Sequence, residues 1–512
     1  MAQLKPDPIA SIPRGNRHSK MAFMSARGLI FGLVLILAPS FSAVAQTGAA
    51  PSESLPKGQI LDKVVCAKSP EQSYALYLPS TYDAARKWPI LYAFDPVARG
   101  RLPVAQFKDA AEKYGWIVVG SNNSRNGSGQ SSVDAWNAIN NDVAERFSID
   151  ERRAYATGFS GGARMALFFA VRCNECLAGV IAGSAGFPSS MTPDASMHFS
   201  IFAAAGTDDF NFSEVSSLDE PLTKAGIAHR IQAFAGRHEW LPAAVATEAV
   251  EWMEVQAIKS GRRDRDEQFI EASWQNALRQ ARAFESAKKS FEAFQTYRWM
   301  VETFSGLHAV NEAEQKFNEY KSAREVKDAI RDEQQQFSKQ RDLEKQFWTT
   351  VAERDRNSRE EGRESLNGQD SRPDQGLDAS VRLSAMLNAW RKDSEAADDN
   401  GKRRVARRVL SGISVALFEQ GSDQLEARKL YAAAVKTFRL VTEVNPDRAG
   451  GFYYLAWAYA ANGDKKRALE NLRTAASKGF SDVAAINDNK AFSGLAADPQ
   501  FQTILQTIRD KK

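Results

Sequence analysis

The sequence predicts a mostly parallel α/β sheet with helices on both faces over residues 60–260, followed by an all-helical region over residues 265–512. Short apolar stretches alternate with helical stretches from about Ser73 to Ile258. Strands that are separated by helices form parallel sheets whose two faces are both covered. After Gly261 the strand patterns end, and charged helical patterns take their place.

The composition fits a soluble protein of several domains. Apolar residues make up 43% and charged residues 25% of the 512, which excludes a collagen, a polytopic membrane protein and a chain disordered throughout. The formal net charge of +4 comes from residues 1–45, where five basic residues accompany one acidic residue. The remainder is balanced in charge and has no basic stripe, so we expect no nucleic-acid partner.

The N-terminal segment, residues 1–45, is typical of a secretory signal peptide. Basic residues up to Arg27 precede the apolar run Leu29–Ala38, and Ala43–Ala45 supplies small residues for cleavage. The run is shorter than the roughly 20 residues that a membrane-spanning helix needs, and an uncleaved anchor is the alternative. We expect a mature protein that begins near Gln46, has no integral membrane span and resides in the periplasm or outside the cell.

Residues 46–262 are expected to form one catalytic domain in which strands and helices alternate. The predicted strands are Tyr74–Leu78, Pro89–Phe94, Trp116–Gly120, Arg153–Phe159, Gly179–Ala182, Ser200–Ala205 and Arg230–Phe234. The predicted helices are Gln106–Tyr114, Val133–Phe147, Gly162–Val171, Val215–Ala225 and Ala243–Ile258. In open parallel sheets, ligands bind beyond the carboxyl ends of the strands, and the functional residues are expected there.

A candidate nucleophile lies at one such end. The predicted strand Arg153–Phe159 leads into Gly158–Gly162 (G-F-S-G-G), and a helix follows. A G-x-S-x-G motif between a strand and a helix is the context of a nucleophile elbow, a tight turn that holds a serine above the sheet. Glycine is needed at both ends of the motif because larger side chains would collide with the neighbouring strand and helix. Ser160 is therefore the candidate nucleophile, and a purely structural turn is the alternative.

A serine nucleophile needs a general base and a carboxylate that orients the base. Of the five histidines, His238 lies in a loop just past the last predicted strand, at the edge where Ser160 is expected. The predicted strand Ser200–Ala205 runs into Gly206–Asp209 (G-T-D-D), which brings two carboxylates to the same edge. Either Asp208 or Asp209 can orient the histidine.

Residues 60–260 resemble the α/β-hydrolase superfamily, in particular small secreted esterases such as polyhydroxybutyrate depolymerases and feruloyl esterases. The residues that carry the resemblance are Tyr77-Leu78-Pro79 with Tyr82, Gly158–Gly162, Gly206–Asp209 and Gly236–Trp240. The resemblance implies an α/β-hydrolase fold and a triad of Ser160, Asp209 and His238 that cleaves a carboxylic ester through an acyl-enzyme. Asp209 is preferred to Asp208 because related enzymes often show G-x-x-D here. A backbone N–H of Gly161 would hold the oxyanion.

The loop after the strand Pro89–Phe94 departs from the pattern of these esterases. Many of them carry His-Gly there, and that loop supplies the second oxyanion donor. This chain has Asp95-Pro96-Val97 instead, with Arg99 and Arg101 nearby. Because Pro96 has no N–H, we expect Val97 to be the donor. The arginines either form a salt bridge with Asp95 or bind an acidic group of the substrate.

Four further residues are candidates for substrate binding: Asp95, Arg99, Asn122 and Trp240. They follow predicted strand ends or lie close to His238. No large insertion separates Ser160 from His238, so we expect no cap domain and an open pocket that suits bulky or polymeric esters.

The chain has three cysteines, Cys66, Cys173 and Cys176. A single C-x-x-C without a second pair makes a poor zinc site. In an oxidising compartment one disulfide with one thiol left over is expected, and the spacing leaves the pairing open, as it does the alternative of buried free thiols. We expect no metal and no organic cofactor.

The C-terminal half is expected to contain three segments. Residues 263–356 are predicted to form a helical hairpin and a long polar helix, and residues 357–378 a flexible charged linker. Residues 379–512 are predicted to form a helical repeat domain, because a 34-residue shift aligns Ala434 with Ala468 and Phe438 with Leu472. This pattern resembles the tetratricopeptide repeat, which implies a protein partner.

The leading functional hypothesis is a secreted or periplasmic serine esterase with a helical repeat appendage. One alternative is a catalytically inactive hydrolase-fold scaffold that binds a partner through the repeats, and another is a serine peptidase on the same fold. Under the leading hypothesis, deletion of residues 265–512 is expected to affect partner binding or solubility more than turnover.

Overall fold

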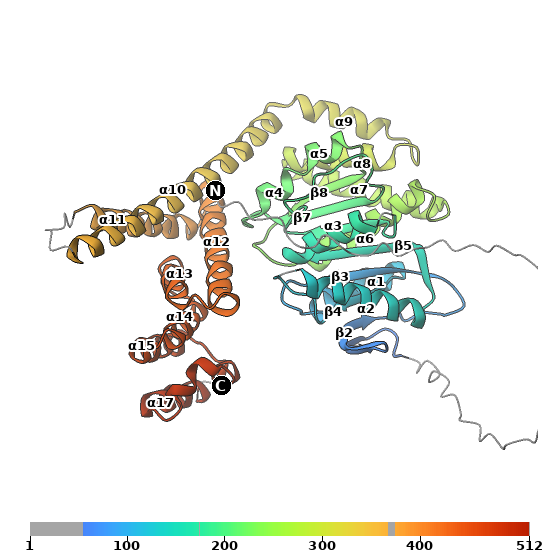
Figure 1. Cartoon of the computed structure of the whole chain (residues 1–512). Coiled ribbons are helices and arrows are strands. Elements are labelled where there is room, and N and C mark those ends of the chain that lie inside the picture. Colours follow the sequence, from blue (N-terminus) through green and yellow to red (C-terminus); the bar gives the residue numbers. More distant parts are fainter. Residues whose placement is uncertain (1–54, 128, 174, 367–373, 511–512) are drawn as a thin grey trace, which may run out of the picture.

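The computed structural model describes residues 55–510 except residues 128, 174 and 367–373, so the expected signal peptide lies outside the described residues. Its first part contains the strands β1 (Ile60–Cys66), β2 (Ser69–Tyr77), β3 (Trp88–Phe94), β4 (Ile117–Ser121), β5 (Ile149–Phe159), β6 (Gly179–Gly183), β7 (Ser200–Gly206) and β8 (His229–Phe234). They form one sheet in the order β1-β2-β4-β3-β5-β6-β7-β8 (Figure 1). β2 pairs antiparallel with both β1 and β4, and all other neighbours are parallel. The predicted fold class is therefore confirmed.

Helices cover both faces of this sheet. Helices α1 (Arg101–Tyr114) and α6 (Ala243–Lys259) share a core with one face, and α2 (Gln130–Arg146) and α3 (Gly161–Cys173) share a core with the other. Successive side chains of a strand point to opposite faces: Leu91 belongs to the first core, and Ile90 and Tyr92 belong to the second. Because both faces are buried, the central strands are apolar throughout.

The helix predicted over Val215–Ala225 is instead two short helices, α4 (Phe212–Ser216) and α5 (Asp219–Lys224). Pro221 explains the break. Proline is tolerated in the first turn of a helix but not in its interior, so a new helix begins two residues before it. Helix α4 begins at Phe212, directly after the loop that follows β7.

The C-terminal half is helical, as predicted. Its elements are α7 (Glu267–Ser286), α8 (Ser290–Phe304), α9 (Asn311–Ser322), α10 (Arg324–Leu366), α11 (Asp374–Ser394), α12 (Gly401–Ser422), a π-helical turn (Asp423–Ala427), α13 (Tyr431–Val444), α14 (Ala449–Ala461), α15 (Lys465–Ser477), α16 (Val483–Asn487), a 3-10 helix (Lys490–Leu495) and α17 (Pro499–Arg509).

The segment predicted as a flexible linker, residues 357–378, is helical at both ends. Helix α10 continues to Leu366 and α11 begins at Asp374, and the residues between them lie outside the described residues. Arginine and glutamate, which abound in this stretch, are good helix formers. A polar and highly charged composition is therefore compatible with a long solvated helix as well as with a loop.

Positions related by the 34-residue shift occupy equivalent places in two helical hairpins. Ala434 in α13 and Ala468 in α15 are fully buried, as are Phe438 and Leu472 one turn later. Gly421 interrupts the apolar pattern for a steric reason: a Cβ atom there would lie 2.8 Å from Cζ of Phe438. The glycine makes room for the phenylalanine ring.

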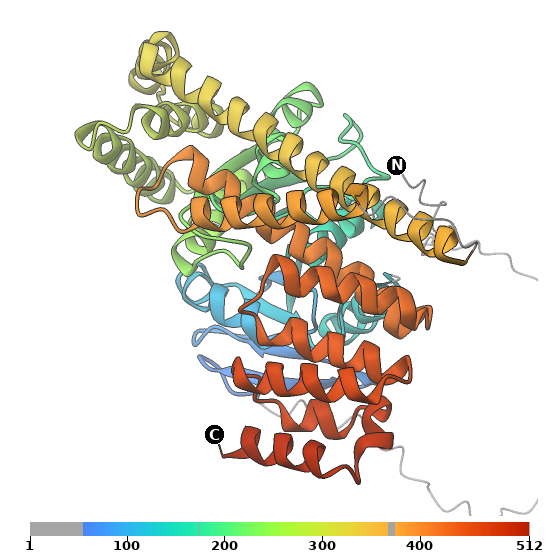
Figure 2. The same ribbon diagram turned by 90° about the vertical axis from the view of Figure 1, so that its left-hand side faces the viewer.

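The helical half is continuous with the sheet half. Trp252 of α6 donates its indole N–H to Oγ1 of Thr303 in α8 at 3.0 Å, and α6, α7 and α8 share a hydrophobic core that includes Val255 and Ile258. Farther along the chain, α12 stands beside the edge of the sheet from which α4 departs (Figure 1). Figure 2 shows the helices from α12 to α17 stacked in front of the sheet.

Cys173 and Cys176 form the disulfide, at the end of α3. Cys66 is a free, buried thiol, and burial raises its pKa to about 11, so it is protonated at neutral pH. No helix within the described residues combines the length and the apolar character that a membrane span requires.

Candidate active site

Ser160 lies in a strained turn between β5 and α3, as the motif predicts. Its φ angle is 53°, in the left-handed region that residues other than glycine rarely adopt. The two flanking glycines are sterically necessary. A Cβ atom on Gly158 would lie 2.2 Å from the carbonyl group of Gly162, and one on Gly162 would lie 1.9 Å from the carbonyl oxygen of Phe94. Strain of this kind clusters at functional sites.

His238 and Asp209 meet at the same edge of the sheet. His238 Nδ1 lies 2.9 Å from Asp209 Oδ1. A carboxylate only accepts hydrogen bonds, so Nδ1 is the donor and Nε2 carries the lone pair of the neutral ring. Asp209 is fully buried, and its Oδ1 also accepts the backbone N–H of Asn211 at 2.8 Å. Both bonds end on Oδ1, whereas the buried Oδ2 has no hydrogen-bond partner among the described residues.

Two aromatic rings enclose the imidazole. The ring of Phe159, the residue before Ser160, lies 4.6 Å from the ring of His238, and the ring of Phe210, the residue after Asp209, lies 4.2 Å from it. These contacts connect the elbow, the acid loop and the base. No hydrogen bond joins the side chains of Ser160 and His238, both of which belong to the described part of the chain. In unliganded enzymes such bonds are often long and tighten only when substrate binds.

Asp208, the second candidate for the acid, points away from the histidine. Its Oδ2 accepts a hydrogen bond from Arg407 of α12 at 2.7 Å. The two consecutive side chains of this turn therefore point in different directions. Asp209 faces His238, and Asp208 faces the helical half of the chain.

The loop after β3 is organised around Asp95, which is fully buried. Its carboxylate accepts the backbone N–H groups of Val97 at 2.9 Å and Arg99 at 3.3 Å. It also accepts Nε and Nη2 of Arg99, at 3.0 and 2.9 Å, and the indole N–H of Trp240 at 2.8 Å. Asp95 and Trp240 are thus turned inward and hold two loops together, and this role replaces the substrate-binding role that the sequence predicted for them.

The remaining predicted residues of this region also have structural partners. The guanidinium group of Arg99 forms a salt bridge with Asp95. Of the two alternatives for this arginine, a salt bridge within the loop or binding of an acidic substrate group, the structure has the first. Asn122 donates its side-chain N–H to the carbonyl oxygen of Asp62 at 3.0 Å, and its backbone N–H to that of Ser73. It fastens the loop after β4 to the first two strands rather than lining a pocket.

Val97 does not present a free N–H to an oxyanion. Its N–H is bonded to Asp95, and the next two N–H groups, of Ala98 and Arg99, also point to Asp95. The assignment of Val97 as the second oxyanion donor is therefore wrong, because the buried carboxylate competes for the same donors. The side chain of Val97 is 62% exposed.

The expected first donor, Gly161, is the first residue of α3, where backbone N–H groups are not used by the helix itself. The side chain of Asn126 lies against it, since a Cβ atom on Gly161 would lie 1.9 Å from Asn126 Oδ1. Asn126 Nδ2 in turn lies 3.4 Å from Oε1 of Glu419 in α12. A residue from the helical half therefore reaches the neighbourhood of the elbow.

Sequence reasoning missed the residues of α12 that meet this edge, because no local pattern connects segments about 200 residues apart. It also missed the aromatic enclosure of His238. That enclosure had a visible signal, since Phe159 lies inside the motif and Phe210 directly follows the two aspartates.

No protein-family model matches the sequence, and no curated protein matches it. Among solved structures, S-formylglutathione hydrolase from Staphylococcus aureus aligns over 40% of this chain and 99% of its own, with 15% identity and a TM-score of 0.32. A ferulic acid esterase aligns over 38% of this chain and 97% of its own, with 17% identity and a TM-score of 0.32. A feruloyl esterase module from Clostridium thermocellum aligns over 40% of this chain and 88% of its own, with 17% identity and a TM-score of 0.31.

Proposed function

We propose that the chain is a serine hydrolase that cleaves carboxylic esters through an acyl-enzyme, with Ser160 as nucleophile, His238 as general base and Asp209 as the orienting acid. The observation that carries the proposal is the hydrogen bond between His238 and the buried Asp209, on the same edge as the strained turn of Ser160. His238 thus has the buried carboxylate that its role requires, and the proposal requires that Ser160 Oγ meets His238 Nε2 when substrate binds.

The reaction follows from this arrangement. Ser160 Oγ attacks the ester carbonyl while His238 Nε2 accepts its proton, and Asp209 stabilises the imidazolium that forms. The proton then passes from His238 to the leaving alcohol as the tetrahedral adduct collapses to an ester on Ser160. Water, deprotonated by His238, attacks this acyl-enzyme. The adduct then collapses, the acid is released, and His238 returns the proton to Ser160 Oγ. The N–H of Gly161 is the donor that we assign to the oxyanion.

The occupied N–H groups of the Asp95 loop favour a second candidate, a hydrolase-fold scaffold without turnover. Loss of one oxyanion donor typically slows an enzyme about 10²–10³-fold. An active enzyme with a single backbone donor would therefore be slow, and an inactive scaffold would keep the triad geometry without using it.

A fluorophosphonate probe distinguishes these candidates, because it reacts only with an activated serine. We expect the probe to label the wild-type chain, and Ser160→Ala to abolish the labelling while Ser217→Ala, which changes an exposed serine of another loop, leaves it intact. Absence of labelling in folded wild-type protein would favour the scaffold.

Substrate class is tested by comparing p-nitrophenyl esters of increasing acyl length with peptide p-nitroanilides. Under the proposal, esters are turned over, and Ser160→Ala and His238→Ala each lower the rate roughly 10³-fold or more. Turnover of the anilides at comparable rates would identify a peptidase instead.

For the helical half, we propose that α12–α15 form tetratricopeptide-like hairpins that bind a protein partner, and that the mature chain is exported to the periplasm or beyond. The equivalent burial of Ala434 and Ala468 supports the repeat, and the order of charged, apolar and small residues in the N-terminal segment supports export. N-terminal sequencing of the protein from a cell fraction outside the cytoplasm tests the export.

A further inference from the structure

Helix α12 contacts the rim of the candidate active site at three levels. Near its start, Arg407 and Arg408 meet the loop after β7. One turn later, a Cβ atom on Gly412 would lie 3.1 Å from Cβ of Phe210. Near its end, Glu419 meets Asn126 above the elbow. At 1.5 Å per residue, the contacts from Arg408 to Glu419 extend along about 16 Å of the rim.

Arg408 is the centre of the first contact. Its side chain is 1% exposed, and its Nε donates to the carbonyl oxygen of Thr207 at 2.7 Å. The guanidinium also lies 4.5 Å from the ring centre of Phe212. Burial lowers the pKa of Arg408 to about 10, although Glu333 opposes the shift, so the group remains charged at neutral pH. Arg408 therefore contacts both ends of the segment Thr207–Phe212, which contains Asp209.

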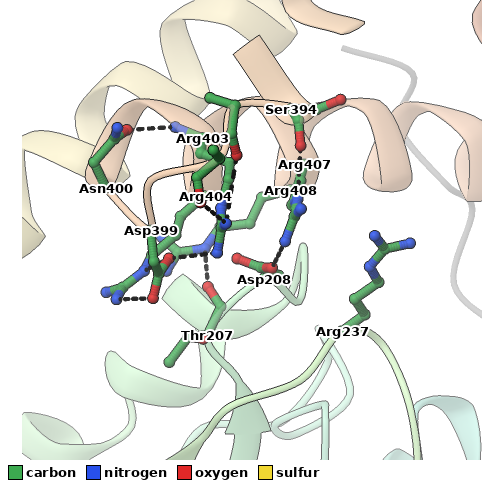
Figure 3. A network of polar contacts seen from close by, with 12 residues as sticks. Thr207, Asp208, Arg237, Ser394, Asp399, Asn400, Arg403, Arg404, Arg407 and Arg408 are labelled. Atoms are coloured by element: carbon green, nitrogen blue, oxygen red, sulfur yellow. Dashed lines mark hydrogen bonds and ion pairs between the residues drawn. The ribbon is translucent and has the colours of Figure 1, made fainter. Parts of the chain in front are cut away.

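Arg407 holds the same segment through a second bond. Its Nη1 bonds to Oδ2 of Asp208 at 2.7 Å, and its Nε donates to the carbonyl oxygen of Ser394 at the end of α11. Figure 3 shows Arg407 and Arg408 reaching down from α12 to Asp208 and Thr207. Arg404, one turn earlier, binds Asp399 within the helical half.

Helix α10 completes the support. Gln340 donates its side-chain N–H to the carbonyl oxygen of Phe210 at 3.0 Å, and the ring of Phe337 lies 5.8 Å from that of Phe212. The helical half therefore contacts Thr207, Asp208, Phe210 and Phe212. These residues surround Asp209, and Phe210 itself packs on His238.

We propose that Arg408 and Arg407 are positioning residues of the hydrolase: from the distant helical half, they hold the acid loop so that Asp209 stays bonded to His238. The inference deepens the proposed function and, for its effect on turnover, rests on it. A displaced acid loop would leave the imidazole free to rotate between Phe159 and Phe210, and proton transfer from Ser160 would then lose its alignment.

The test uses point variants of the full chain. Arg408→Met keeps the bulk of the side chain but removes the donor and the charge, and Arg408→Lys restores a charge and a donor. Arg407→Gln tests the second bond at a partly exposed position, and Arg404→Gln is the matched control on the same helix. Each variant is assayed for kcat and KM on p-nitrophenyl acetate, for the rate of fluorophosphonate labelling, and for hydrogen exchange of the backbone segment 206–213.

We expect Arg408→Met to lower kcat at least 10-fold with less than a 2-fold change in KM, and to speed exchange in segment 206–213 but not in α3. Arg408→Lys should recover much of the loss, Arg407→Gln should show a smaller one, and Arg404→Gln should behave as wild type. If Arg408→Met does not fold, the comparison of Arg407→Gln with Arg404→Gln decides, since neither side chain is fully buried.

Two results would overturn the inference: wild-type exchange and kcat in the arginine variants, or the same loss in Arg404→Gln. Failure of the proposed function has a different signature. The wild-type chain would then neither react with the probe nor hydrolyse esters, while exchange in segment 206–213 would still respond to Arg408→Met.

Discussion

Trp240 donates its indole N–H to the buried carboxylate of Asp95, 145 residues earlier in the chain, at 2.8 Å. Asp95 follows β3, and Trp240 lies two residues after His238. The bond therefore connects the loop beside the elbow to the loop that carries His238. Asp95 lies in the loop from which the sequence predicted a second oxyanion donor, and its carboxylate instead holds the loop that follows His238.

Replacement of this tryptophan should impair both stability and turnover. Trp240→Phe removes a donor from a buried carboxylate, which typically costs about 1–3 kcal/mol in the free energy of unfolding. Trp252→Phe is the matched control, because its indole N–H is bonded to Thr303 far from the site. Urea unfolding should reveal a loss in both variants, whereas kcat should fall only in Trp240→Phe. Equal turnover in the two variants would contradict the anchoring role.

The glycines of the elbow should differ in their tolerance of a methyl group. In Gly162→Ala the new Cβ would meet the backbone oxygen of Phe94, which cannot move aside, so we expect a loss of about 3 kcal/mol or more in the free energy of unfolding. In Gly161→Ala the obstacle is the exposed side chain of Asn126, which can rotate. Thermal unfolding measures both, and a larger loss in Gly161→Ala would contradict this steric account of the turn.

Asp219 should stabilise the protein in a pH-dependent way. Burial alone would raise its pKa, but hydrogen bonds from His229 and Arg298 outweigh burial and lower the pKa to about 2. An unfolded aspartate titrates near pKa ~3.9, so the stabilisation is complete above that pH and is lost as the pH falls toward 2. Asp219→Asn should therefore be less stable than wild type at pH 6, and the difference should narrow by pH 3.

The control for this measurement is Glu220→Gln, which alters an exposed neighbour paired only with Lys224 on the same helix. It should change stability little at either pH. A difference between Asp219→Asn and wild type that is the same at pH 6 and pH 3 would exclude the ionised carboxylate as its source.

Truncation should separate the contribution of α7–α9 to stability from that of α12 to turnover. Because α12 contacts the acid loop, we no longer expect deletion of residues 265–512 to spare turnover. A chain ending at residue 262 would expose Val255 and Ile258 and leave the indole of Trp252 without Thr303, so we expect it to aggregate. A chain ending at residue 322 keeps α7–α9 over α6 but lacks Arg407 and Arg408. It should fold, as judged by circular dichroism, and hydrolyse esters at least 10-fold more slowly than the full chain.

The sequence predicted the features that short-range physics determines. Most strands and helices of the first half follow from apolar runs, although the edge strand β1 was not predicted. The elbow follows from the sterics of Gly158 and Gly162 around Ser160. Local reasoning does not decide between Asp208 and Asp209, because neighbouring side chains of a turn point in different directions. Only the fold determines which of them meets His238.

The features that escaped prediction depend on contacts between distant segments. Nothing in the sequence near Asp95 indicates that Trp240 will donate to its carboxylate or that this carboxylate will occupy the N–H of Val97. The sequence-based prediction ended the long helix α10 too early and assigned its last residues to a linker. The reason is that charge density does not distinguish a solvated helix from a loop. The role of Arg408 depends on how the two halves dock, which no local pattern reveals.

The separation of 199 positions between Asp208 and Arg407 also sets an order of events during biosynthesis. A ribosome that has finished the strands and the elbow has yet to make the helix that holds the acid loop. If Arg407 and Arg408 position the acid loop as proposed, a nascent chain without α12 would contain Ser160, His238 and Asp209 but not their final alignment. Under the proposed function, activity would therefore arise only after α12 has been made and has docked.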